Sequence, residues 1–183
     1  MIKEIIVDAY VYAREKHKGQ KRKFSNLDYF THPKAVARII EDLTKNHHIV
    51  AAALLNDVIE DTDSTYEELV DKFGIGIADL VMEVTETLEK RNGRKKVDYL
   101  IDEIKHMSED ALTLKLADRY HNVKWLAVDI TNVAHYGFVI YYTKQTKEIM
   151  NTIQYSKLND VQTILYDGIM NSIMYIEKKF WRK

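Results

Sequence analysis

Apolar residues recur every three to four positions along most of the chain, which is the spacing of one buried face on an α-helix. The first seventeen residues are typical, because Ile5, Ile6, Ala9, Tyr10 and Ala13 fall on a single face. No long stretch alternates apolar and polar residues with the period of two that marks a β-strand. One proline and six glycines among 183 residues force few breaks. The pattern therefore predicts an all-α protein.

Helix starts and ends can also be predicted from local signals. Thr31-His32-Pro33 is typical of a helix start, because proline is tolerated in the first turn. Ser64 with Glu67, or Thr65 with Glu68, resembles a capping box. After the first helix, we expect helices at about residues 33–46, 49–59, 65–73, 77–88, 95–107, 108–128, 136–155 and 158–180, with Gly74 and Gly76 separating the fourth helix from the fifth.

Length and composition fit a single globular domain over residues 1–183, without a linker or an internal repeat. Apolar residues make up 46% of the chain, which is too many for a disordered protein. The 27 Lys and Arg balance 28 Asp and Glu, so no overall charge draws the chain to nucleic acid or a membrane. No segment has the roughly 18 apolar residues of a membrane span, and we expect a cytoplasmic protein. The absence of cysteine excludes disulfides and zinc–thiolate sites.

The expected third helix gathers four polar residues on one face. With Asn56 set at 0°, Glu60, Asp57 and Asp61 fall at roughly 40°, 100° and 140°. Apolar residues fill the opposite arc, and no Lys or Arg lies among the acidic ones. This face is either an acidic surface strip or a site that binds a cation.

Asp118 is the second candidate for chemistry. It shares a helical stripe with Leu114, Asn122 and Trp125, and so faces a partly apolar groove. An unpaired carboxylate is costly there, so either a metal ion or an internal salt bridge to Lys or Arg must compensate.

His32 is the third candidate, because its place beside Pro33 at a helix start restricts its backbone. It is either a capping or core histidine or a metal ligand. The other histidines lack such a context and are expected to be structural or surface residues: His17, His47, His48, His106, His121 and His135. One imidazole, two aspartates and the Asn56 amide can surround Mn²⁺ or Mg²⁺. Glu60 and Asp61 would then orient or deprotonate a water molecule.

Four segments, in this order, resemble a known family: Gly19-Gln20-Lys21-Arg22-Lys23, Tyr29-Phe30-Thr31-His32-Pro33, Ala52-Ala53-Leu54-Leu55-Asn56-Asp57-Val58-Ile59-Glu60-Asp61-Thr62 and Lys115-Leu116-Ala117-Asp118-Arg119-Tyr120-His121-Asn122. They are similar to the hydrolase domain of the RelA/SpoT alarmone enzymes, and their spacing fits the stand-alone small alarmone hydrolases of the HD-domain superfamily. The resemblance covers residues 9–150, and we expect the helix at 158–180 to pack on this part.

The resemblance implies an all-α helical bundle that removes the 3′-pyrophosphate from guanosine tetra- or pentaphosphate with Mn²⁺. By matched position, the metal ligands would be His32, Asp57 and Asp118, the catalytic acids Glu60 and Asp61, and the substrate contacts Arg22, Lys23, Tyr29 and Asn122. The segment from Arg14 to Lys23 supports a polyphosphate ligand, because it carries six basic residues against one Glu, although a solvated basic loop would have the same composition.

Asn56 departs from the family pattern, because the defining His-Asp pair is Asn56-Asp57 here. An amide oxygen is the weaker ligand, so metal affinity should fall by about 10- to 100-fold. Three outcomes stay open: Asn56 binds metal through its carbonyl, the site binds nucleotide without hydrolysing it, or the residue is an introduced inactivating substitution.

The alternatives to an alarmone hydrolase are a nucleotide-binding module without activity and a phosphohydrolase for a different phosphorylated nucleotide. RNA binding through residues 16–23 and 90–96 lacks the interleaved aromatic residues it needs, and no synthetase domain or protein partner is indicated.

Overall fold

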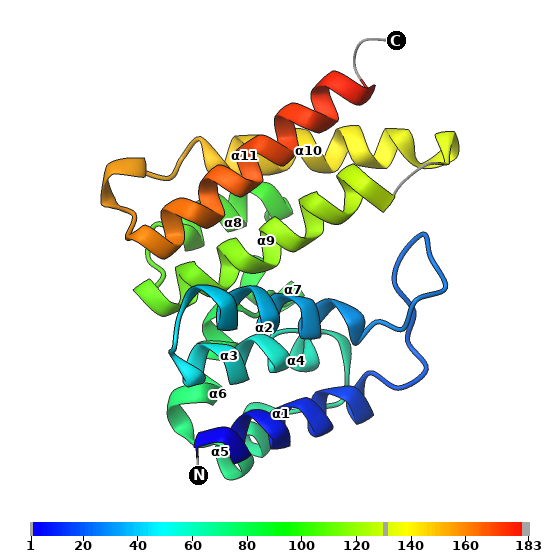
Figure 1. Cartoon of the computed structure of the whole chain (residues 1–183). Coiled ribbons are helices and arrows are strands. Elements are labelled where there is room, and N and C mark those ends of the chain that lie inside the picture. Colours follow the sequence, from blue (N-terminus) through cyan, green and yellow to red (C-terminus); the bar gives the residue numbers. More distant parts are fainter. Residues whose placement is uncertain (1, 130–131, 181–183) are drawn as a thin grey trace.

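The computed structural model describes residues 2–129 and 132–180, which are mostly helical (Figure 1). These residues form no strand, and the pairing of Lys21 with Asp28 is an isolated β-bridge. None of their helices is long and apolar enough to cross a membrane. Residues 1, 130, 131 and 181–183 of the expected domain lie outside the described part. The elements are α1 (Ile2–Lys16), α2 (Thr31–Leu43), α3 (His47–Leu55), α4 (Val58–Asp61), α5 (Tyr66–Phe73), α6 (Ile75–Val84), α7 (Leu88–Arg91), α8 (Lys96–Ile104), α9 (Glu109–Asp129), α10 (Tyr136–Met150), α11 (Asp160–Phe180) and two short 3₁₀ turns, η1 (Val133–His135) and η2 (Tyr155–Lys157).

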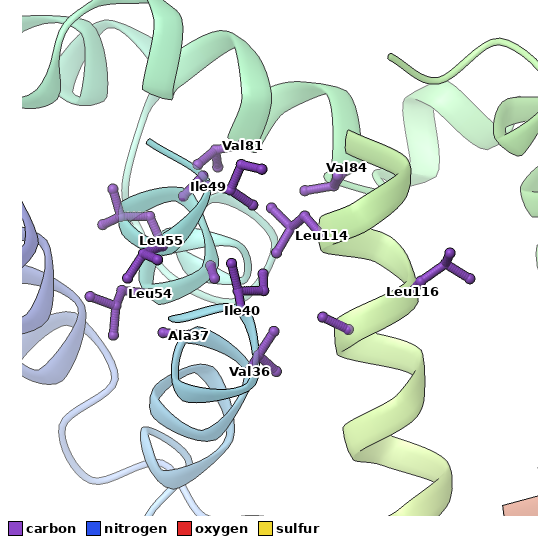
Figure 2. Packing of buried hydrophobic residues seen from close by; sticks show 14 of the residues in the cluster. Val36, Ala37, Ile40, Ile49, Leu54, Leu55, Val81, Val84, Leu114 and Leu116 are labelled. Carbon is purple, nitrogen blue, oxygen red and sulfur yellow. The ribbon is translucent and has the colours of Figure 1, made fainter. Parts of the chain in front are cut away.

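The helix α3 lies at the centre of the main core. Its sequence is apolar on every side, so it must be covered on every side, and all its residues from Ile49 to Leu55 are buried. The helices α1, α2, α6 and α9 contact it. Figure 2 shows Ile49 and Leu55 of α3 in the same cluster as Ile40 of α2 and Val81 of α6. Three consecutive alanines, residues 51–53, keep α3 thin enough for these helices to approach closely.

The long helix α9 separates the central helices from the C-terminal pair. It contacts α2, α3 and α6 with one side and α10 and α11 with another. Leu114 points toward the central cluster and Leu116 points away from it, and both are buried (Figure 2). Glu109 and Lys124 of α9 are exposed at the surface, whereas Asp118 and Asn122 line a cavity beside the helix.

The prediction of one continuous helix over residues 49–59 is wrong. α3 ends at Leu55, and α4 begins at Val58 after a break at Asn56 and Asp57. Asp57 has φ −102° and ψ −3°, in the sparsely populated region between helix and strand. Its carboxylate accepts a hydrogen bond from the Tyr29 hydroxyl at 3.0 Å, a contact that the local sequence does not encode.

Several other boundaries also differ from the prediction. Gly74 ends α5 with φ +81°, but Gly76 lies inside α6 and separates nothing. α6 stops at Val84 because Thr85 is extended and its hydroxyl bonds back to the Val81 carbonyl, so residues 88–91 form α7 instead. Of the two possible capping boxes, Thr65 is the N-cap of α5. α10 ends at Met150 rather than near residue 155.

Candidate active site

One cavity of about 350 Å³ brings all ten predicted site residues together. Its walls come from the loop after α1, the first turn of α2, the junction of α3 and α4, and the helices α8, α9 and α10. The predicted residues that line it are Arg22, Lys23, Tyr29, His32, Asn56, Asp57, Glu60, Asp61, Asp118 and Asn122. The structure thus gathers these side chains from four separate segments, while their chemical roles stay predictions.

The three predicted charged metal ligands lie next to one another. His32 Nε2 lies 2.9 Å from Asp118 Oδ1 and 3.6 Å from Asp57 Oδ2. The His32 side chain is only 3% exposed, and both carboxylates are mostly buried. Adjacent ligands of an octahedral ion with bonds of about 2.1 Å lie about 3 Å apart. The contact between His32 and Asp118 therefore has the spacing of neighbouring ligands of one ion, and the contact between His32 and Asp57 is about 0.6 Å longer than that spacing.

Asn56 supplies the strongest sign that the site fits a cation. Its Nδ2 donates to Asp57 Oδ1 at 3.0 Å, while its buried Oδ1 accepts no hydrogen bond. A buried acceptor without a partner costs about 1–3 kcal/mol, which a bound cation would relieve. In the described part of the chain, no group of three or more His, Cys, Asp or Glu side chains could by itself hold a metal ion. Because its buried oxygen has no partner, the Asn56 amide would be an additional donor to a cation held by His32, Asp57 and Asp118.

The two buried carboxylates differ in their affinity for a proton. Burial raises the pKa of Asp57, and the negative charges of Asp118 and Asp61 raise it further. Burial acts on Asp118 in the same direction, but the hydrogen bond and charge of His32 outweigh it and hold the pKa of Asp118 well below its ordinary value. Asp118 is therefore the firmly ionised member of the pair. A divalent cation between the carboxylates would remove the repulsion that raises the pKa of Asp57.

His121 lies beside the site, although it was expected to be a structural or surface residue. Its Nδ1 lies 2.7 Å from His32 Nδ1. Burial lowers the pKa of His121 to about 3, so the ring is neutral near pH 7 and can either donate to His32 or accept from it. A metal-ligating histidine needs a partner of this kind to fix its tautomer. The available signal was spacing, because His121 lies three residues after Asp118 on α9.

The two predicted catalytic acids, Glu60 and Asp61, line the cavity and are exposed to water. Glu60 Oε2 accepts a hydrogen bond from the Glu86 backbone N–H at 3.3 Å, and the Asp61 carbonyl accepts one from the Gln20 side chain at 2.8 Å. Although water reaches Glu60, the surrounding protein desolvates it enough to raise its pKa, and the charge of Asp57 adds to this effect. A carboxylate with a raised pKa is the better proton acceptor.

A basic and aromatic wall forms one end of the cavity. The Arg22 guanidinium lies 4.9 Å from the ring centroid of Trp125 and donates to Asn122 Oδ1 at 3.3 Å. Lys23 Nζ lies 4.3 Å from the ring centroid of Phe138. Flat rings beside cations suit a nucleotide, because the rings can stack on a base while the cations bind phosphate.

A second set of cations lines the cavity, and sequence reasoning missed it. Lys96 of α8 lies 2.7 Å from the buried Glu86, which holds the pKa of Lys96 above its usual value despite burial. Lys115 donates to the Val84 carbonyl at 2.9 Å, and Arg119 donates to the Tyr142 hydroxyl at 2.9 Å. Arg119 follows Asp118 directly in the sequence, which is a usable signal, whereas nothing local places Lys96 here.

Comparisons with known proteins show which family the sequence matches. A family model described as "HD domain" matches residues 9–142. A guanosine-3′,5′-bis(diphosphate) 3′-pyrophosphohydrolase of Aquifex aeolicus is 41% identical over 127 residues, which are 68% of this chain and 18% of that protein. The bifunctional (p)ppGpp synthase/hydrolase SpoT of Escherichia coli is 37% identical over 128 residues, 64% of this chain and 17% of that protein. The chain thus spans less than a fifth of the length of these relatives.

A solved structure of similar size shares the fold. It is described as a metazoan ortholog of SpoT that hydrolyzes ppGpp. Its TM-score to this chain is 0.79 at 26% sequence identity, over 91% of this chain and 94% of that one. The fold is therefore that of a known structure.

Proposed function

The chain belongs to the HD domain family, and from this premise we propose that it is a divalent-metal-dependent hydrolase that removes the 3′-pyrophosphate from guanosine 3′,5′-bis(diphosphate). The observation that carries the proposal is the meeting of His32, Asp57 and Asp118 beside the unpartnered Asn56 oxygen in a cavity lined by cations. The names of the relatives supply the substrate, because this geometry fits many phosphorylated nucleotides.

Four side chains would hold the metal: His32, Asn56, Asp57 and Asp118. Oxygen donors with one imidazole favour Mn²⁺, with Mg²⁺ as the alternative. When bound, such an ion polarises a phosphoryl oxygen and lowers the pKa of water. Asp57 and Asp118 would balance its two positive charges, and the His121 ring would hold the His32 tautomer that offers Nε2 as a ligand.

Glu60 and Asp61 would position water and accept its proton during attack on the phosphorus atom. Glu60 suits this role because its pKa is raised and the Glu86 backbone N–H fixes one carboxylate oxygen. Arg22 and Lys23 would hold phosphate groups, with Tyr29 and Asn122 beside them. The positive charges of Arg22 and Lys23 reduce the electrostatic repulsion between an anionic substrate and the five carboxylates in the cavity wall.

The direct test is product analysis with guanosine 3′,5′-bis(diphosphate) as substrate. We expect release of pyrophosphate that depends on Mn²⁺ and stops on chelation, with a loss of at least about 100-fold in Asp118→Asn. Lys45→Gln, which changes an exposed charge outside the cavity, serves as the control. The absence of turnover above a metal-free blank at saturating Mn²⁺ would refute the proposal. A panel of other phosphorylated nucleotides then separates the guanine substrate from a different one.

Asn56 favours a second candidate, a module that binds nucleotide without hydrolysing it. A neutral amide binds metal more weakly than an imidazole does. Among the described residues, no group of three or more His, Cys, Asp or Glu side chains could hold a metal ion without help from Asn56. This candidate predicts calorimetric binding of the nucleotide without product. It also predicts that Asn56→His creates activity that the chain with Asn56 lacks.

A further inference from the structure

A second cavity, of about 820 Å³, lies between the end of α1 and the start of α2. It shares no lining residue with the candidate active site, but the two cavities use opposite side chains of one loop. Asp28 and Phe30 line the second cavity, whereas Tyr29 between them lines the first. Because the lining residues differ, binding in the second cavity does not depend on the activity proposed above.

The charge of this cavity is positive once internal pairs are counted. Glu15 pairs with Lys18 at 3.0 Å, and Asp28 pairs with Lys21 at 2.6 Å. Within the described part of the chain, the exposed side chains of Arg14 and Lys34 form no salt bridge, but the Arg14 charge acts on Asp28 and Lys34 Nζ lies 5.8 Å from the centroid of the Tyr10 ring. The C-terminal end of α1 and the N-terminal end of α2 meet here, so their dipoles oppose each other and the side chains decide which ligand is preferred.

His17 is a buried residue in the wall of this cavity, and one of its ring nitrogens has no hydrogen-bond partner. It is 1% exposed, and its Nδ1 lies 2.8 Å from Gln20 Oε1. The Gln20 amide nitrogen donates to the Asp61 carbonyl, so Gln20 presents its oxygen to His17, and Nδ1 carries the proton of that hydrogen bond. His17 Nε2 is buried and has no hydrogen-bond partner in the protein. Because His17 lines the cavity, a ligand that reaches Nε2 from there would supply that partner.

We propose that this second cavity binds a phosphate group between Arg14, Lys34 and His17. The two cations would donate to the anionic oxygens, and a P–OH group would donate to His17 Nε2. Phosphate carries both kinds of oxygen near neutral pH, whereas sulfate carries no hydroxyl. The same chemistry is present in inorganic phosphate, in pyrophosphate and in a nucleoside monophosphate.

Nuclear magnetic resonance can monitor a reporter in each cavity of the intact chain, and the charge variants described below separate direct binding at His17 from an effect passed on through Tyr29. With ¹⁵N-labelled histidine, the His17 Nε2 resonance reports on the second cavity and is assigned through the Tyr29 ring, whose centroid lies 4.9 Å from that of His17. The indole N–H of Trp125 reports on the first cavity. We expect inorganic phosphate to shift the His17 resonance saturably. Pyrophosphate and GMP, titrated in parallel, show whether the preferred source is the free anion or a nucleotide.

Matched charge changes test which residues bind. Arg14→Gln with Lys34→Gln should weaken the phosphate affinity measured at His17 by at least about tenfold, because two charge-assisted hydrogen bonds are lost. Lys45→Gln with Lys105→Gln removes the same charge outside both cavities and should change it less than about twofold. The proposal is overturned if phosphate shifts Trp125 but not His17, if both double variants weaken binding equally, or if sulfate binds as tightly as phosphate.

Discussion

Replacement of Asn56 by histidine tests the candidate metal site at its unusual position. The Asn56 side chain is buried, but it lines the cavity of about 350 Å³, which gives an imidazole room without disturbing α3. One imidazole N–H can replace the amide as donor to Asp57 Oδ1, and the other nitrogen can bind metal where Asn56 Oδ1 now has no partner. We expect Asn56→His to bind Mn²⁺ about 10- to 100-fold more tightly.

The expected gain corresponds to about 1.4 to 2.8 kcal/mol of binding free energy. At saturating Mn²⁺ the same amount adds to the free energy of unfolding, which raises Tm by roughly 3 to 11 °C in a domain of this size. Calorimetric titration with Mn²⁺ measures the affinity, and thermal unfolding with and without Mn²⁺ measures the linked stability.

Asn56→Gln is the matched control, because it keeps the amide and changes only its reach. It should show no gain in Mn²⁺ affinity. If folded Asn56→His binds Mn²⁺ no more tightly than the unchanged chain, and Mn²⁺ shifts its Tm no further, Asn56 does not belong to the metal site. An equal gain in the Gln variant would show that reach, and not the imidazole, limits binding.

Three further substitutions test other parts of the structure. Gly168→Ala should lower the free energy of unfolding by about 1 kcal/mol in urea, because its Cβ would lie 2.8 Å from the Tyr120 ring; with Tyr120→Leu in place, the cost should disappear. Tyr29→Phe removes the donor to Asp57 and should cost about 1–3 kcal/mol of stability, seen as a lower urea midpoint with an unchanged m-value. Lys96→Met should raise KM for the nucleotide about tenfold or more with little change in Mn²⁺ affinity, and an unchanged KM would remove Lys96 from the substrate contacts.

The helices and the gathering of the site could be predicted from sequence because both leave local marks. Apolar periodicity marks the face that each helix buries, and the segments around His32, Asn56-Asp57 and Asp118 carry polar residues where a buried face would be apolar. The break before α4 left no such mark. A helical wheel assumes unbroken geometry, whereas the conformation of Asp57 accompanies a hydrogen bond from Tyr29, a residue 28 positions earlier.

Missed residues of the site share one property, which is that their neighbours in space are distant in sequence. Glu86 is a single acid after α6, and its burial makes sense only once Lys96 and Arg91 are placed beside its carboxylate. His121 has an ordinary sequence context until His32 is placed against it. A sequence pattern shows that a residue needs a partner but does not show which one. The charge pairs across the cavity can therefore be identified only from the three-dimensional structure.

The position of α9 links the stability of the fold to the geometry of the site. One face of α9 carries Asp118 and Asn122 into the cavity, while Tyr120, between them in sequence, packs against Gly168 of α11. Successive residues on a helix point about 100° apart. If a larger residue at position 168 pushed Tyr120 and shifted α9, the Asp118 carboxylate would therefore also move from its 2.9 Å contact with His32. The C-terminal helix lies beyond the matched family residues 9–142, yet its packing fixes α9. It therefore supports the candidate metal site, and none of its described side chains lines the cavity.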